Sequence, residues 1–157
     1  MSISVSNMIG VSLEYTDTSP SFALGTTVNL SDGGQAVYVR AASTVATYSA
    51  VSVLVDNTVV PLTTTNSANS KAVGFAQVSI ASAYYGWVQL GGKPRVLVAA
   101  NCQPSVPLFT TATAGVLDDA TVTAGLVAGL VATTSTVTAS NVTCIAGYPH
   151  VLTGLNA

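Results

Sequence analysis

Hydrophobic and polar residues alternate with a period of two over most of this chain, which is typical of half-buried β-strands. The alternation is clear in residues 35–40, 52–55 and 58–62. The last two runs are separated by Asp56-Asn57. This dipeptide predicts a tight hairpin turn, because Asn and Asp tolerate positive φ.

Further strands are predicted along the rest of the chain. They cover residues 72–78, 86–90, 94–98, 106–109, 126–132 and 136–146. Thr and Val dominate these runs, and branching at Cβ favours the pleated surface of a sheet. Gly91-Gly92 predicts a second hairpin, between residues 86–90 and 94–98. Only residues 79–85 leave room for a single helical turn.

Many short strands with Gly and Pro at short intervals predict an all-β fold, a small antiparallel β-barrel or sandwich. The 157 residues are about the length of one domain and are sufficient to bury a core. We therefore expect a single β-domain over residues 22–157, preceded by an extended N-terminal arm over residues 1–21.

The predicted arm has strand patterning of its own. Ile3 and Val5 alternate with serines, and Val11 and Leu13 alternate with Ser12 and Glu14. Such a segment can pair with the sheet edge of a neighbouring molecule, so these four apolar residues are candidates for binding a partner. A first edge strand of the same domain, or a frayed terminus, fits the pattern equally well.

A short sequence echo links two parts of the chain. Residues 73–76 (Val-Gly-Phe-Ala) lead after a gap to residues 88–91, and residues 128–131 (Ala-Gly-Leu-Val) lead after a similar gap to residues 144–147. Either these are related strands of one barrel, or the match arises by chance in a chain rich in few residue types.

Charged residues make up only 6% of the chain, against roughly 25% in an ordinary soluble domain. The net charge of −2 offers no basic surface for nucleic acid. No apolar run approaches the ~20 residues of a membrane-spanning helix, and no basic and apolar leader precedes the domain, so synthesis in a cytosol without membrane association is expected. This composition favours a structural or interaction protein.

Candidate chemistry is sparse. Asp118-Asp119 is the one adjacent carboxylate pair, and a solvated turn explains it better than a Ca²⁺ loop. His150 has no acid or nucleophile near it in sequence. We therefore expect no enzyme activity, no metal and no cofactor. Cys102 and Cys144 are expected to be reduced core residues, although spacing alone leaves a disulfide between them open.

Tyr84, Tyr85 and Trp87 form the densest aromatic group in the sequence. Aromatic side chains dominate the energetics of cores and interfaces, so this group predicts a core anchor or an oligomer interface. The alternative is a glycan-binding surface on a host-facing adhesin or fibre tip.

The same region resembles a known family. Residues 72–76 and 85–92 (Tyr-Gly-Trp-Val-Gln-Leu-Gly-Gly), followed by Ala114-Gly115 and residues 128–132, are similar to small head decoration (capsid cement) proteins of tailed bacteriophages. Those proteins carry a G-x-A stretch followed by Y-G-W-V-x-x-x-G. Residues 25–28 and 36–39 also resemble the first core strands of that family, and the likeness extends over residues 22–146.

This resemblance implies a tulip-like β-domain, usually a homotrimer, on the outer capsid surface of the virion. Its partners would be neighbouring copies of the major capsid protein, which it bridges and stabilises. The low charge of this chain departs from the family pattern. The adhesin remains the alternative function.

Overall fold

The computed structural model describes residues 11–67, 72–121 and 125–152. These residues form thirteen β-strands in one continuous sheet and no helix, which confirms the predicted all-β fold. The predicted helical turn at residues 79–85 does not form: Ile80 makes a β-bridge with Val45, residues 82–83 form a turn, and Tyr85 begins a strand. Within the described ranges, no helix exists that could cross a membrane.

The first five long strands close into a barrel, which we call the first barrel. Its strands are β3 (Gln35–Ala41), β4 (Ala50–Val53), β5 (Thr58–Pro61), β6 (Ala72–Ala76) and β7 (Tyr85–Gln89). The ring runs β3-β5-β4-β6-β7 and returns to β3. Only the β3–β5 pair is parallel. The predicted hairpin at Asp56-Asn57 is confirmed, since β4 and β5 pair antiparallel and Asn57 has φ 62°.

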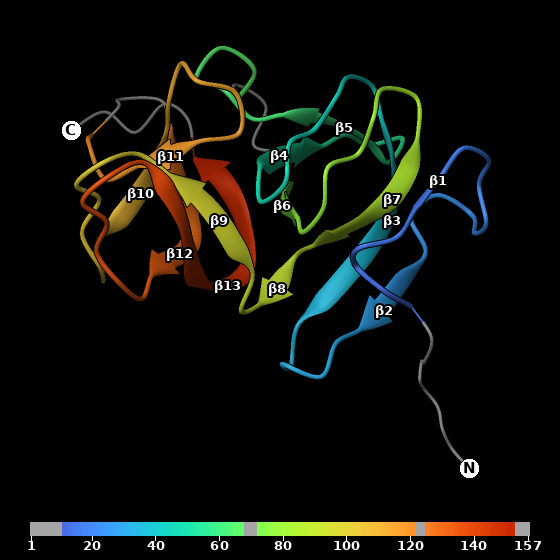
Figure 1. The fold of residues 1–157 in the computed structure, drawn as a ribbon, viewed down its shortest axis with the longest axis horizontal. Helices are drawn as coiled ribbons and strands as arrows, with labels where there is room; N and C mark the ends of the chain where they lie inside the picture. Colours follow the sequence, from blue (N-terminus) through green and yellow to red (C-terminus); the bar gives the residue numbers. More distant parts are fainter. Residues whose placement is uncertain (1–10, 68–71, 122–124, 153–157) are drawn as a thin grey trace.

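A second barrel follows along the chain and lies beside the first, in yellow, orange and red in Figure 1. Its strands are β9 (Arg95–Val98), β10 (Pro107–Thr110), β11 (Leu117–Asp118), β12 (Leu126–Ala132) and β13 (Ser140–Leu152). The ring runs β9-β11-β10-β12-β13 and returns to β9, with β9–β11 as the parallel pair. The order of strands around this ring is the same as in the first barrel, with β9 to β13 in the places of β3 to β7.

Backbone turns repeat between the two barrels as well. Tyr48 (φ 64°) lies two residues before β4, and Ser105 (φ 61°) lies two residues before β10. Asn57 leads into β5 and Gly115 (φ 75°) into β11. The sequence echo falls on the matching pairs β6–β7 and β12–β13, so it relates equivalent strands of two barrels rather than parts of one.

Gly91-Gly92 forms β8, and the hairpin predicted there is wrong. β7 and β9 belong to different barrels, and β8 runs between them and pairs with Gly147 and Ala146 of β13. The physical reason lies outside the dipeptide: the Asp32 carboxylate accepts hydrogen bonds from the Lys93 N–H at 2.9 Å and from Gln89 Nε2 at 2.8 Å. These bonds hold the connection extended.

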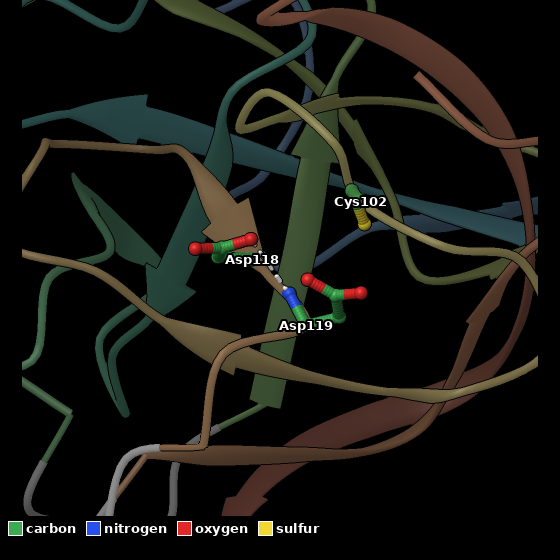
Figure 2. Close-up of side chains that lie close together, drawn as sticks. All are labelled: Cys102, Asp118 and Asp119. Carbon is green, nitrogen blue, oxygen red and sulfur yellow. Dashed lines mark hydrogen bonds between the residues drawn. The ribbon is translucent and has the colours of Figure 1, made fainter. Parts of the chain in front are cut away.

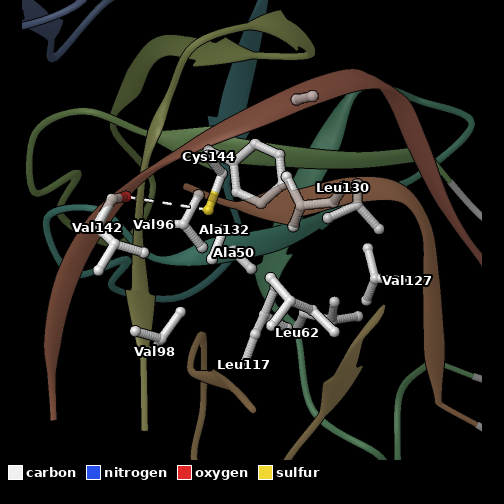
Figure 3. Packing of buried hydrophobic residues seen from close by; sticks show 14 of the residues in the cluster. Ala50, Leu62, Val96, Val98, Leu117, Val127, Leu130, Ala132, Val142 and Cys144 are labelled. Carbon is white, nitrogen blue, oxygen red and sulfur yellow. Dashed lines mark hydrogen bonds between the residues drawn. The ribbon is translucent and has the colours of Figure 1, made fainter. Parts of the chain in front are cut away.

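The barrels are joined by backbone hydrogen bonds and by a common core. The Ala50 N–H donates to the Gly115 carbonyl at 3.0 Å, and the Leu97 N–H donates to the Tyr48 carbonyl at 2.9 Å. Phe75 on β6 is fully buried among residues of the second barrel. Figure 3 shows side chains from both barrels in this cluster, among them Ala50, Leu62, Leu117 and Cys144.

The interior of the first barrel is separate and consists mainly of valines. It holds Val37, Val39 and Ala41 of β3, with Val51, Val59, Ala76, Ile80 and Val88. The alternate residues of β3, Ala36 and Tyr38, point to the outer face and pack with Trp87. Residues 11–30, including β1 (Thr16–Asp17) and β2 (Thr27–Asn29), cover this outer face.

Candidate functional site

The predicted arm residues divide into two groups. Ile3 and Val5 lie outside the described residues. Val11 and Leu13 are half-buried and pack against the outer-face cluster of Ala36, Tyr38 and Trp87 in their own chain. Just after them, β1 pairs with β7. Contact of these residues with a partner protein stays a prediction.

The predicted aromatic residues lie in different environments. Trp87 is 3% exposed and Tyr85 is half-buried, whereas Tyr84 is 38% exposed. Tyr85 stacks on Tyr38, with ring centroids 6.3 Å apart and an interplanar angle of 15°. In this chain Trp87 is an anchor of the outer-face core, and its role in an oligomer interface stays a prediction.

Phe22, Tyr38, Tyr85 and Trp87 together form what we call the aromatic cluster. The Phe22 ring meets both Tyr38 and Trp87 edge to face, with centroid separations of 5.3 Å in each case. The Tyr38 and Trp87 centroids are 5.1 Å apart. Edge-to-face geometry places positive ring edges against negative ring faces, which stabilises the cluster beyond simple burial.

One carboxylate is built into the aromatic cluster. The Tyr38 hydroxyl donates to Asp17 Oδ2 at 2.7 Å and accepts a hydrogen bond from the Ser21 N–H at 3.1 Å. Burial, reinforced by the hydrogen bond to Asp17, raises the pKa of the Tyr38 phenol. The phenol therefore keeps its proton and fixes the orientation of the carboxylate.

A small pocket opens between the N-terminal segment and β7. Its volume is about 230 Å³. Three aromatic side chains, two serines, a carboxylate and one valine line it: Tyr15, Phe22, Trp87, Ser12, Ser21, Asp17 and Val11. Of the residues that the sequence singled out, this pocket brings together only Trp87 and Val11.

Sequence reasoning missed Tyr15, Asp17 and Phe22. Tyr15 continues the alternation of Val11 and Leu13, whereas Asp17 and Phe22 lie after it, in the stretch around Pro20 where no period is visible. A signal existed in the composition of this stretch, since residues 15–22 hold two aromatics and an acid in a chain that is 6% aromatic and 6% charged.

A second, larger hollow lies on the outer face of the second barrel, and we call it the apolar groove. Its volume is about 540 Å³, and apolar residues of β10, β12 and β13 line most of it. It forms where pairing shifts: Pro107 lies opposite Val131 but Leu108 lies opposite Val127. The same strand, β12, also has a bulge at Gly129 (φ +84°), where its pairing with β13 shifts.

Cys102, Asp118 and Asp119 are the one grouping of potential metal ligands found in the described ranges (Figure 2). Their ligand atoms lie within 4.8 Å of one another. However, Asp118 accepts a hydrogen bond from the Asp119 N–H at 2.9 Å, and Asp119 accepts one from the Gln103 N–H at 3.0 Å. Burial and the two nearby carboxylates raise the pKa of the Cys102 thiol. The cluster is that of a hydrogen-bonded turn with a protonated thiol.

The two cysteines are free and buried, as predicted. Burial, with a smaller contribution from Cys102, raises the pKa of Cys144 to about 12. A thiol with this pKa is protonated at neutral pH and is a poor nucleophile. Both cysteines therefore act as small apolar residues of the common core.

The chain matches no protein-family model and no curated protein. Among solved structures, its fold is similar to the crystal structure of the head fiber gp8.5 N base in bacteriophage phi29. The TM-score is 0.51 at 13% sequence identity, over 80% of this chain and 98% of that chain. At this identity the likeness concerns the fold, and nearly all of the phage chain takes part in it.

Proposed function

We propose that this chain is a structural protein of a bacteriophage virion, bound to the outer capsid surface, where it bridges neighbouring major capsid proteins. The observation that carries the proposal is the similarity of its fold to a phage head fiber base, over 98% of that base. The sequence resemblance to head decoration proteins points independently to the same class.

The composition supports a role in which much of the surface is covered by protein. Only ten of the 157 residues are Lys, Arg, Asp or Glu. A decoration protein stabilises a shell because it binds the assembled form in preference to free subunits. Many copies, each with a modest contact, add up to a large effect.

The apolar groove is the part of the described surface best suited to such a contact. Ile145 is 52% exposed at its rim, and Val131, which is opposite Ile145 in the β12–β13 register, is also exposed. Burying one aliphatic side chain of this kind is worth about 1.5–3 kcal/mol. Repeated over several subunits, that gain is sufficient to hold a cement protein on a shell.

We further propose that the chain is a homotrimer whose N-terminal arms grip the shell by strand addition. Fixing an extended backbone costs about 1–2 kcal/mol per residue, so a single arm binds weakly and three arms together bind firmly. Val11 and Leu13 would tether the arm to its own barrel, leaving Ile3 and Val5 for the partner.

Co-sedimentation with heads tests the proposal. Heads of the encoding phage that lack this protein are mixed with the purified chain and pelleted. We expect saturable binding at a fixed ratio of chain to major capsid protein. If the chain stays in the supernatant at every concentration, the proposed function is wrong.

Two variants with a matched control localise the contact. Ile145→Lys is expected to weaken binding about tenfold or more, because it places a charge at the rim of the groove. Val137→Lys adds the same charge at a site that is 83% exposed in the same barrel, and it should bind like the wild type. Deletion of residues 2–9 should weaken binding while it preserves the packing of Val11 and Leu13.

A further inference from the structure

The small pocket beside the aromatic cluster combines two features that are independent of capsid binding. Three aromatic side chains, Tyr15, Phe22 and Trp87, form its walls. Trp87 is held in place by Phe22 and Tyr38, whereas Tyr15 is 70% exposed. Trp87 therefore forms the rigid base with little exposed area, and the ring surface open to a ligand belongs mainly to Phe22 (43% exposed) and Tyr15.

The serine and aspartate side chains that line this pocket all come from residues 12–21. Asp17 lines the pocket, and its Oδ2 atom accepts the Tyr38 hydroxyl hydrogen bond, which fixes the carboxylate. A carboxylate has about four lone-pair sites on its two oxygens, so Asp17 retains capacity to accept further hydrogen bonds. Ser12 and Ser21 also line the pocket.

A pyranose ring requires both of these features at once. Its C–H groups form an apolar face that packs on the negative face of an aromatic ring, and its hydroxyls project from the ring edge toward acceptors. An aliphatic ligand would remove water from the carboxylate without offering it a hydrogen bond in return, which costs binding energy. An acidic sugar would place two negative groups together.

We propose that the small pocket binds a single neutral pyranose residue, stacked on the aromatic walls with its hydroxyls donating to Asp17. This assignment does not rest on the virion role. It also differs from the aromatic surface expected from sequence, because of Tyr84, Tyr85 and Trp87 only Trp87 lines the pocket.

Trp87 provides a direct probe, since it is the only tryptophan of the chain. The full-length protein is titrated with the methyl glycosides of glucose, galactose, mannose and N-acetylglucosamine at millimolar concentrations, while tryptophan emission is recorded. Saturation-transfer NMR on the same mixtures detects binding that leaves emission unchanged. We expect a saturable emission change with at least one glycoside and transfer to its ring C–H protons.

Variants of the pocket decide whether the signal comes from this site. Tyr15→Ala and Phe22→Ala each remove a wall and should weaken binding about tenfold, as expected for the loss of an aromatic contact. Asp17→Asn removes the charge from the acceptor and should weaken binding about fivefold. Because Tyr15 is mostly exposed, Tyr15→Ala remains informative even where Phe22→Ala disturbs folding.

Tyr84→Ala is the matched control, since it removes an exposed tyrosine next to β7 that does not line the pocket. It should bind as the wild type does. The proposal is overturned if none of the four glycosides gives a saturable emission change or saturation transfer. It is equally overturned if Tyr84→Ala weakens binding as much as Tyr15→Ala. Neither result bears on co-sedimentation with heads.

Discussion

At the scale of single residues, the junction between the barrels depends on Gly34, a position with no space for a side chain. A Cβ at Gly34 would overlap the backbone carbonyl of Gly91, whereas one at Gly33 would meet nothing within 4 Å. Backbone cannot move aside as a flexible side chain can. Gly33 instead has φ +84°, so its constraint is conformational rather than steric.

The two glycines therefore form a matched pair. We expect Gly34→Ala to lower the free energy of unfolding by about 3 kcal/mol, or to prevent folding, because it forces β8 away from β3. Gly33→Ala should cost only about 1–2 kcal/mol, the usual strain of a left-handed alanine. Urea denaturation of both variants measures this, and equal losses would show that the close approach is not constraining.

Asp32 makes the same junction sensitive to acid. Burial opposes ionisation of its carboxyl, but hydrogen bonds from the Lys93 and Gly34 N–H groups and from Gln89 outweigh this effect and hold its pKa below the ordinary value of 3.8. Because the pKa of this carboxyl is lower in the folded state than in the unfolded state, its ionised form stabilises the folded protein. That contribution is complete above the unfolded pKa and is lost as the pH falls through the folded pKa.

We therefore expect the free energy of unfolding to fall as the pH drops below about 4. Asp32→Asn should be less stable than the wild type at neutral pH, and the difference should shrink toward acid pH. Urea denaturation between neutral pH and pH ~3 tests this. Parallel curves for the two proteins over the whole range would contradict the role assigned to Asp32.

At the scale of elements, β4 and β6 lie between the two cores and connect them. Val51 of β4 faces the interior of the first barrel, while its neighbour Ala50 belongs to the common core. In β6, Phe75 lies in the common core and Ala76 in the first interior. Adjacent residues of a strand point to opposite faces, so each of these strands contributes to both cores.

This arrangement predicts one unfolding transition for both barrels. Phe75→Ala should lower the free energy of unfolding by about 3–5 kcal/mol. Because Trp87 belongs to the first barrel, its emission reports that barrel, whereas far-ultraviolet circular dichroism reports all strands. Both signals should shift to the same new midpoint.

Val55→Ala is the control for Phe75→Ala, since Val55 is 97% exposed and should leave the midpoint unchanged. Two separated transitions, one for Trp87 emission and one for circular dichroism, would show that the barrels unfold independently and that β4 and β6 do not couple them.

The sequence was sufficient to predict the strands but not their ring order. The period of two locates β3 to within one residue, and the turn signal at Asp56-Asn57 locates the β4–β5 hairpin, although β4 begins at Ala50, two residues earlier than predicted. Nothing in a period of two specifies the parallel β3–β5 and β9–β11 pairs, which depend on closing each ring. Gly91-Gly92 shows the same limit, since its extended form depends on Asp32, some sixty positions earlier.

The candidate site was predictable only in part for a similar reason. Trp87 is conspicuous in sequence and lies in the outer-face core. Phe22 and Asp17 reach it from a segment without periodicity, and their roles follow from contacts with Tyr38 that cross the fold. Local pattern cannot predict contacts of this kind.

At the scale of the whole molecule, the exposed apolar surface predicts self-association. Large hydrophobic residues remain exposed on both barrels, among them Leu24, Val131, Ile145 and Tyr148. We expect multi-angle light scattering at micromolar concentration to give three times the 15.7 kDa mass of the chain. A stable particle of 15.7 kDa would rule out the proposed homotrimer.

The central claim, that this chain is a virion structural protein on the outer capsid surface, is tested most directly by locating it on purified virions. Antibodies against the chain, with gold conjugates, are applied to intact virions of the encoding phage and imaged by electron microscopy. The account predicts label distributed over the head, at many copies per particle, and loss of label when the gene is deleted. Virions that carry no label, or label confined to the tail, would contradict it.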